Sequence, residues 1–395
     1  MTESLVQTIT DTIGACVAGA KRPVALHEPS FAGNEWAYVK ECIDTGWVSS
    51  VGSFVDRYEA DLARMMGVAR AVAVVNGTAA LHVGLLLADV ERDDEVLLPA
   101  LNFIASANAV SYCAAVPHFV DIEEETLGVS AARLRDYLNG IAERRPNGLF
   151  NRNSGRRIRA LIVMHTFGHP CDLVGLKAVC DEFDLALIED AAEALGTRYQ
   201  GKSVGGWGLL STLSFNGNKI VTTGGGGAIL TNDAAVADRA KYLTTTARRP
   251  HRWEFIHDAV GFNFRMPNLN AALGCAQLEQ LDDALSRKRL LAERYSAAFS
   301  RVQGVRFFTE PGSGQSNYWL NTLILEPDVA HLRDAVLAST NDAGLMTRPA
   351  WVLMHHLPMY EHCPRMDLRV CEDLVARIIN IPSSAALVGS DSGRS

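Results

Sequence analysis

The sequence predicts an α/β fold: a mainly parallel central sheet with helices on both faces, followed by a smaller C-terminal α+β domain. Two observations predict it. Short apolar runs alternate with helix-patterned segments through residues 71–243, and such alternation is typical of parallel sheets covered on both faces. A long amphipathic segment then leads into a remainder with mixed strand and helix patterns.

The expected elements follow an N-terminal helix in order. The strands are short apolar runs bounded by turn residues, at residues 71–75, 95–98, 118–120, 158–164, 185–188, 212–215 and 227–230. Helices are expected at about 34–45, 54–66, 78–90, 103–114, 173–183 and 234–243. Ligands of such sheets bind beyond the carboxyl ends of the strands. The segments expected at one crevice are therefore residues 76–78, Phe103, Asp190 and residues 214–219.

The second half begins with what reads as one long helix over residues 267–300, because alanine and leucine recur on one face with charges opposite. A helix of this kind commonly connects two domains. We therefore expect a large domain with an N-terminal substrate segment at residues 1–265 and the connecting helix with a small domain at 266–395. A strand in "YWLNTLIL", a helix near 329–343 and an exposed loop in "NGLFNRNSGRRIRA" complete the expectation.

Composition and charge exclude several function classes. The 395 residues are 48% hydrophobic and 21% charged, as in soluble globular proteins. The net charge of −8 argues against nucleic acid as a partner. No apolar run approaches the roughly 20 residues that span a bilayer, and Glu3 and Asp11 are unlike the start of a signal peptide. The eight scattered cysteines lack a CxxC pair, which favours reduced thiols in a cytoplasmic protein.

Two motifs offer sites for charged ligands. In "VVNGTAALHVGLLLA" a strand ends at Asn76, Gly77 permits a tight turn, and Thr78 opens a helix whose free N–H groups can bind a phosphate. In "LALIEDAAEALG" an apolar strand carries Glu189 and Asp190 to its carboxyl end, where a buried carboxylate needs a partner. A plain helix cap remains the alternative for each motif.

A lysine beside glycines, in "SFNGNKIVTTGGGG", gives these motifs a common chemistry. Alone, Lys219 would be a solvated charge in a turn. With the acid and the phosphate site it fits pyridoxal phosphate: the amine bonds to the cofactor aldehyde, and Asp190 keeps the ring nitrogen protonated so that the ring accepts electrons. A P-loop is excluded because no Ser or Thr follows the lysine.

With these residues the chain resembles the DegT/StrS-type sugar aminotransferases, which are fold-type I, pyridoxal-phosphate-dependent enzymes acting on nucleotide-linked keto-sugars. The resemblance covers residues 24–385, and its most specific stretches are "NGTAALH", "EDAAEALG", "SFNGNKIVTTGGGG" and "GFNFRMPNLNAALG". It implies that Lys219 is the catalytic lysine, which also moves the proton at the substrate carbon, and that Asp190 binds the ring nitrogen.

The resemblance implies further cofactor contacts. Phe103 matches an aromatic position that stacks on the cofactor ring, with a core helix residue as the alternative. The phosphate ligands expected from one subunit are Gly77, Thr78 and Ser214. Asn263 matches a position that reaches the phosphate across a dimer interface, so we expect a homodimer with shared active sites.

Glu193 and three histidines are the remaining candidate residues. Glu193 stands where many relatives have Gln or His near the phenolic oxygen of the cofactor, and an ionised carboxylate would repel that oxygen. Either Glu193 is protonated or it turns toward the substrate; we expect the second. His165 matches a strand-end position that lines the pocket, whereas His355 and His356 have no assigned role. We expect no metal ion.

The N-terminal segment "LHEPSFAGNEWAYVKECIDTGWVSSVGSFVDRYE" is most similar to 4-aminotransferases of legionaminic acid and bacillosamine-type pathways. The implied substrate is a nucleotide-linked 4-keto-6-deoxy-N-acetylhexosamine, with glutamate as amino donor. Its expected contacts are Trp47, Ser49 and Ser50, with a core anchor as the alternative for Trp47. Other candidates are a 3-aminotransferase, a perosamine-type enzyme whose sugar lacks the acetamido group, and a non-catalytic cofactor- or sugar-binding regulator. No compact motif selects among UDP, GDP and dTDP.

Overall fold

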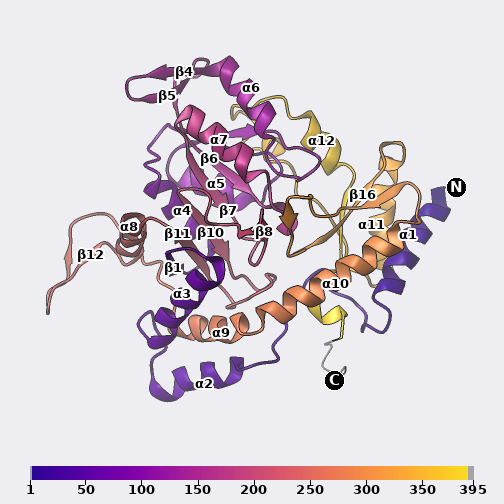
Figure 1. Cartoon of the computed structure of the whole chain (residues 1–395), viewed down its shortest axis with the longest axis horizontal. Helices are drawn as coiled ribbons and strands as arrows, with labels where there is room; N and C mark the ends of the chain where they lie inside the picture. Colours follow the sequence, from indigo (N-terminus) through magenta and orange to yellow (C-terminus); the bar gives the residue numbers. More distant parts are fainter. Residues whose placement is uncertain (1, 390–395) are drawn as a thin grey trace.

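A nine-stranded sheet forms the centre of the larger part of the computed structural model, which describes residues 2–389 (Figure 1). Its seven-stranded path has the order β1-β11-β10-β7-β6-β2-β3. The bounds in that order are Arg70–Val74, Gly227–Thr231, Leu210–Ser214, Ala186–Asp190, Arg157–Met164, Glu95–Pro99 and Val116–Val120. The hairpin of β4 (Ala142–Arg145) and β5 (Gly148–Asn151) extends the sheet from β6.

The direction of the strands confirms the expected mainly parallel sheet. From β10 to β3 all neighbours on this path run parallel, and only β11 runs antiparallel to its neighbours β10 and β1. In the parallel register Asp190 of β7 lies opposite Thr212 of β10 and Met164 of β6. The carboxyl ends of these strands therefore meet at one edge, where the sequence places its charged motifs.

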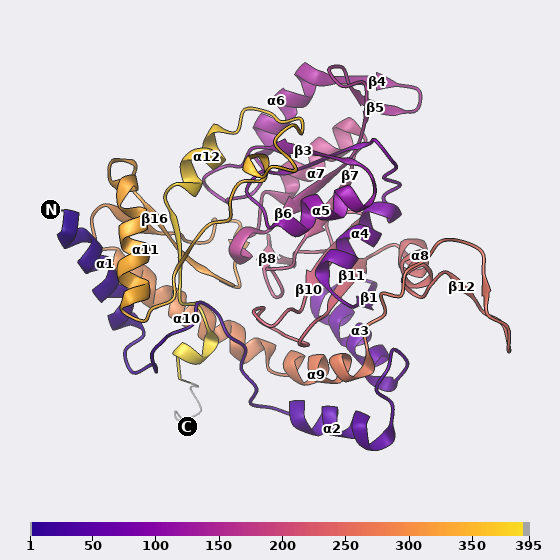
Figure 2. The same ribbon diagram turned by 180° about the vertical axis from the view of Figure 1, so that it is seen from behind.

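Helices cover both faces of this sheet, with α7 in front in Figure 1 and α4 and α5 in front in Figure 2. The expected helices are α2 (Glu35–Thr45), α3 (Ser53–Met66), α4 (Gly77–Leu87), α5 (Ile104–Tyr112), α7 (Leu173–Phe183) and α8 (Ala234–Thr244). The helices α3, α4, α5, α7 and α8 contact strands of the sheet, whereas α2 packs against α9. The helix α6 (Ala131–Ile141) lies where the sequence analysis expected no element.

The single helix expected over residues 267–300 is wrong. The chain forms α9 (Asn268–Leu278) and α10 (Leu281–Phe299), with a break between them (Figure 2). At the break, Gln280 donates through Nε2 to Glu35 at 2.6 Å, and Glu279 accepts from Arg57 at 2.6 Å. These bonds hold the end of α9 against α2 and α3, whereas α10 continues toward the smaller part of the molecule.

The smaller part contains an antiparallel sheet of order β14-β16-β18-β17 (Val305–Phe307, Asn321–Leu325, Ile378–Ile381 and Arg348–Pro349) and the helix α11 (Arg333–Asp342). The N-terminal helix α1 (Thr2–Cys16) packs against α10 and α11. Its Ile9 and Ile13 share a core with Tyr295 and Phe299. The division at residue 266 remains a prediction, but α1 lies with the C-terminal elements.

The expected loop "NGLFNRNSGRRIRA" is only partly a loop. Its first residues form β5 and its last residues begin β6, and these strands pair antiparallel. Residues 152–156 between them are exposed, as expected. The strands were missed because β5 has only four residues and just two of them are buried.

Two further features bear on the surface of the protein. Residues 248–257, which include the two-residue strands β12 (Arg248–Arg249) and β13 (Ile256–His257), form a hairpin that projects from the body beside α8 (Figures 1 and 2). We call residues 248–257 the arm. Within residues 2–389, no helix has the length and apolar character needed to cross a bilayer.

Candidate active site

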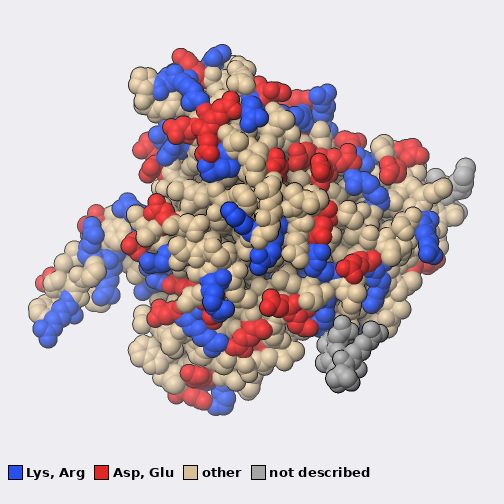
Figure 3. Space-filling model, viewed as in Figure 1, with Lys and Arg blue, Asp and Glu red and all other residues tan. Residues whose placement is uncertain are grey.

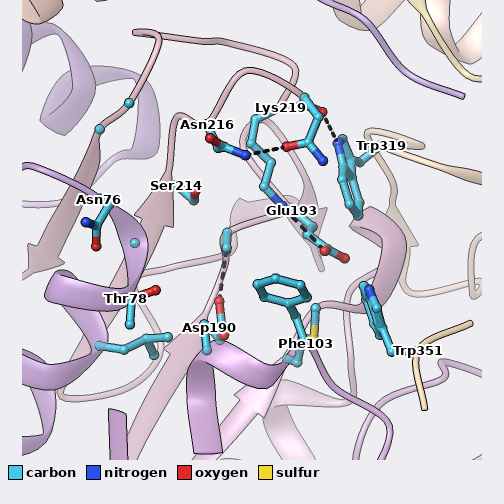
Figure 4. Close-up of a pocket in the computed structure, with 18 residues that line it drawn as sticks. Asn76, Thr78, Phe103, Asp190, Glu193, Ser214, Asn216, Lys219, Trp319 and Trp351 are labelled. Carbon is cyan, nitrogen blue, oxygen red and sulfur yellow. Dashed lines mark hydrogen bonds and ion pairs between the residues drawn. The ribbon is translucent and has the colours of Figure 1, made fainter. Parts of the chain in front are cut away.

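A cavity of about 300 Å³ lies at the carboxyl ends of β7 and β10 (Figure 4). Ligand sites in proteins typically begin at about this volume. Its wall brings together most residues that the sequence singled out, from segments far apart in the chain. These are Gly77, Thr78, Phe103, Asp190, Glu193, Ser214 and Lys219. The expected crevice is therefore present at the strand ends.

Lys219 enters this cavity from the loop that follows β10. The loop is closed by a hydrogen bond from the Phe215 amide to the Gly226 carbonyl, at 2.8 Å. The lysine side chain is 14% exposed, and its Nζ lies 3.5 Å from Oε1 of Glu193. The lysine amine is thus held at the cavity wall and is not free in solvent.

Asp190 places a buried carboxylate on the opposite side of the cavity. Its Oδ2 accepts from the Ser106 hydroxyl at 2.7 Å and its Oδ1 from the Ala192 amide at 3.2 Å. Burial raises the pKa of Asp190, while these two donors and the charge of Lys219 act in the other direction. Among residues 2–389 no cationic side chain forms an ion pair with it. A cation in the cavity would supply the partner that a buried carboxylate needs.

The start of α4 forms an anion site beside these groups. The Asn76 side chain caps the helix by accepting from the Ala79 amide at 2.7 Å, which leaves the Gly77 and Thr78 amides at the cavity wall. A Cβ atom on Gly77 would come within 2.9 Å of Ser214 Cβ. Glycine is therefore required for the end of β10 to approach the helix start, where N–H groups and helix dipole favour a phosphate.

This donor set fits pyridoxal phosphate. The wall offers an amine for the aldehyde, a carboxylate for the ring nitrogen and a helix N-terminus with two hydroxyl side chains for the phosphate. Phe103, which the alternative interpretation placed in the core, is 50% exposed and lies at the cavity. Its ring centroid is 6.2 Å from that of Trp351, so the two aromatics form one side of the cavity.

Glu193 faces the lysine from a buried position. Its Oε2 accepts from the Phe167 amide at 2.9 Å, and its backbone carbonyl accepts from the Asn317 side chain at 2.8 Å. Burial raises the pKa of Glu193 to about 7, although the charge of Lys219 and the Phe167 amide both lower it. Near neutral pH the carboxyl can therefore exist in either protonation state beside the lysine.

Trp319 is a cavity residue that the sequence analysis missed, because "YWLNTLIL" was interpreted only as a strand. Lys219 Nζ lies 3.9 Å from the centroid of its ring, a cation–π contact. Its indole Nε1 donates to the Asn218 carbonyl at 2.8 Å, and its carbonyl accepts from buried Lys288 at 3.1 Å. Its amide donates to Asn317 Oδ1 at 2.8 Å. These bonds fix the face of the indole toward the Lys219 amine.

Other expected site residues lie outside the cavity wall. His165 is buried behind it, with Nε2 3.2 Å from Glu189 Oε2 and Nδ1 accepting from the Cys171 amide at 3.4 Å. Glu189 also accepts three backbone N–H groups, from Gly205, Trp207 and Gly208, so its carboxylate supports the local backbone. The expected pocket-lining role of His165 has no contact to support it within one chain.

The expected substrate segment and Asn263 are also absent from the residues that line the cavity. The Trp47 and Ser49 carbonyls accept from Asn268, at 2.7 and 2.6 Å, which ties the segment around Ser50 to α9. Trp47 is 58% exposed, so its alternative interpretation as a core anchor is wrong. Asn263 is exposed near the base of the arm and accepts from Arg265 at 3.1 Å. Their substrate and phosphate contacts remain predictions.

Comparison with known proteins agrees with this geometry. The profile of the DegT/DnrJ/EryC1/StrS aminotransferase family matches residues 29–394. GDP-perosamine synthase from Vibrio cholerae is 36% identical, over 91% of this chain and 94% of the relative. GDP-perosamine synthase from Caulobacter vibrioides is 37% identical, over 94% of this chain and 96% of the relative. The crystal structure of the aminotransferase TlmJ from Streptoalloteichus hindustanus superposes with a TM-score of 0.83 at 29% identity, and the superposition covers 93% of this chain and 95% of TlmJ.

The raised pKa of Glu193 generates a prediction about the cofactor-free protein. The pKa of Glu193 is about 7 in the folded protein and about 4.3 in the unfolded chain. Its protonated carboxyl therefore stabilises the folded state fully only below a pH of about 4.3. That contribution is lost as the pH rises through about 7. We expect Glu193→Gln to gain about 3 kcal/mol in free energy of unfolding relative to the wild type between pH 5 and pH 8, measured by urea titration.

The control for this measurement is Glu361→Gln, which changes a carboxylate that is 55% exposed. It should follow the wild type at both pH values. Parallel pH dependence of Glu193→Gln and the wild type would contradict the raised pKa.

Proposed function

The chain belongs to the DegT/DnrJ/EryC1/StrS aminotransferase family, and we propose that it transfers an amino group to C4 of a GDP-linked 4-keto-6-deoxyhexose that lacks an acetamido group. Family membership makes it a pyridoxal-phosphate-dependent sugar aminotransferase. Glutamate is the proposed amino donor, and the unpaired state of all eight cysteines supports a cytoplasmic location.

The choice of sugar rests on the names of the relatives. Both curated relatives described above are named GDP-perosamine synthase, and each alignment spans over 90% of both chains. This favours the perosamine-type substrate over the N-acetylated sugar of legionaminic acid and bacillosamine-type pathways that the sequence analysis placed first. The order of the two candidate substrates is therefore reversed.

The cavity residues have separate roles in this reaction. When bound, pyridoxal phosphate supplies a ring that accepts electrons as the hydrogen leaves the substrate carbon. Lys219 Nζ takes and returns that proton as a general base and acid. Asp190 keeps positive charge at the ring nitrogen.

The remaining wall residues orient the ligands and shield the reacting carbon. The start of α4 and Ser214 hold the phosphate, and Phe103 and Trp351 exclude water from one side of the cavity. Glu193, 3.5 Å from the lysine, is placed to hold a proton near Nζ.

A second copy of the chain is proposed to complete the site. Lys219 is the one cationic side chain among the described residues of the cavity wall, which also carries Asp190 and Glu193. A cofactor phosphate and a nucleotide diphosphate need more positive charge than this wall provides. In a symmetric dimer each site would receive residues from the partner, and Asn263 is the position that the family resemblance assigns to this contact.

The arm carries positive charge that the cavity wall lacks. It carries Arg248, Arg249 and Arg252, and basic residues gather on it in Figure 3. It also exposes Trp253 and Phe255, which are 68% and 75% accessible. Large aromatic side chains projecting from the body are typical of interface residues. We infer that the arm and Asn263 reach the active site of the partner.

The proposed substrate is tested with a panel of nucleotide-linked 4-keto-6-deoxy sugars. Purified enzyme loaded with pyridoxal phosphate is given glutamate and each sugar, and products are identified by NMR. We expect kcat/KM for the GDP-linked sugar without an acetamido group to exceed that for the UDP-linked N-acetylated sugar by at least about 100-fold, since mismatched polar groups cost several kcal/mol.

Lys219→Ala is the matched control and should give no product with any sugar. Preferential turnover of the N-acetylated sugar would overturn the proposed substrate while leaving the aminotransferase class intact. Turnover of no sugar by the loaded wild-type enzyme would contradict the proposed reaction itself.

Shared active sites predict complementation between two inactive variants. Lys219→Ala lacks the amine in its own site, and Asn263→Asp places a negative charge against the phosphate in the partner's site. After unfolding and refolding an equal mixture, about half of the dimers are mixed and each has one intact site. We expect about a quarter of wild-type activity, measured against each variant refolded alone.

No recovery in a mixture whose mixed dimers are verified by native mass spectrometry would contradict shared sites. A fully active monomer in sedimentation analysis would contradict them as well.

A further inference from the structure

Three potential metal ligands lie close together, and none of them lines the cavity. His355 and His356 lie on the short turn η3 (Met354–His356), and Glu372 lies on α12 (Arg369–Val375). One ligand atom from each residue lies within 4.8 Å of the others. The two imidazole rings are 4.1 Å apart between centroids, and neither η3 nor α12 contributes a residue to the reaction proposed above.

The contact between His355 and Glu372 already has the spacing of two ligands of one ion. Nε2 of His355 lies 3.1 Å from Oε1 of Glu372. Two ligand atoms at about 2.0–2.2 Å from a common ion are about 2.8–3.1 Å apart at octahedral angles and about 3.3–3.6 Å apart at tetrahedral angles. A metal ion could therefore be bound with small movements of these side chains.

His355 is the buried member of this cluster. Its side chain is 4% exposed. Its buried Nδ1 has no hydrogen-bond partner among the described residues. His356 and Glu372 are exposed, so an ion can enter from solvent and keep water in its remaining positions.

We propose that His355, His356 and Glu372 bind one divalent transition-metal ion per chain, of the class of Zn²⁺, Co²⁺ or Ni²⁺. Two imidazoles and one carboxylate are a ligand set that these ions prefer over Mg²⁺ or Ca²⁺, which take mainly oxygen ligands. This proposal departs from the expectation of no metal ion, because Glu372 on α12 reaches the histidines on η3 only through the fold.

The bound ion would join η3 to α12 and so stiffen one side of the active-site cavity. Trp351, in the cavity wall, lies three residues before Met354, where η3 begins. The Met354 amide donates to the Ala100 carbonyl at 3.1 Å. The ion takes no part in amino transfer. Its effect is structural stabilisation of the segment that carries Trp351.

The test uses the cofactor-loaded enzyme after treatment with EDTA and dialysis. Co²⁺ is titrated while the visible spectrum is recorded, and Zn²⁺ is titrated by calorimetry. We expect one equivalent per chain beyond any background, weak visible bands typical of nitrogen and oxygen ligands, and a rise in Tm that grows with metal concentration.

Two variants separate this site from other metal binding. His356→Gln removes an exposed imidazole and leaves the His355–Glu372 contact in place, so the fold is retained. We expect it to weaken metal binding at least tenfold and to reduce the rise in Tm at the same metal concentration. His362→Gln is the control: His362 is 93% exposed and pairs at 3.2 Å with the single carboxylate of Glu361, so its loss should leave binding unchanged.

Equal binding by the wild type and His356→Gln would overturn the proposal, as would the absence of a bound equivalent in the wild type. An intense thiolate–cobalt band would overturn it too, because Cys113 and Cys363 are the partly exposed thiols of the chain. Each of these results would leave the proposed aminotransferase reaction untouched.

Discussion

The carboxylate of Asp190 is the constraint on which the rest of the site depends. A carboxylate that is 4% exposed, at the end of a buried strand, is stable only if hydrogen bonds and a nearby cation compensate for the lost hydration. Ser106 and Ala192 supply two hydrogen bonds, and the cavity leaves room for a cationic ring. The parallel register of β7 and β10 then decides which residues face that ring.

The two parts of the molecule meet at the lysine. The loop after β10 belongs to the large sheet, whereas Trp319 precedes β16 of the smaller one. Trp319 joins them, since its indole Nε1 bonds to the lysine loop and its carbonyl bonds to Lys288 on α10. Trp319 therefore connects α10 to the indole face on which the Lys219 amine rests.

Local sequence patterns were sufficient for the sheet and for the core of the site. Buried strands are continuous apolar runs, and ligands collect at their carboxyl ends, so Asp190, Ser214 and Lys219 could be placed together before any coordinates. The features that the sequence did not predict depend on contacts between distant segments. The break after α9 is held by polar bonds to α2 and α3. Neither Trp319 nor the proposed metal site at His355 has a local signature. His165 has a strand-end position, yet its bond to Glu189 turns it away from the cavity.

The ¹⁵N chemical shift of the ring nitrogen in isotope-labelled pyridoxal phosphate tests the central claim most directly. The measurement compares the loaded wild-type enzyme with Asp190→Asn, which retains the shape of the side chain but not its charge. If Asp190 stabilises the cationic ring, the wild-type nitrogen will show the shift of a protonated pyridine at pH 8, and the variant will show that of the neutral ring. Identical shifts in the two proteins would contradict the account.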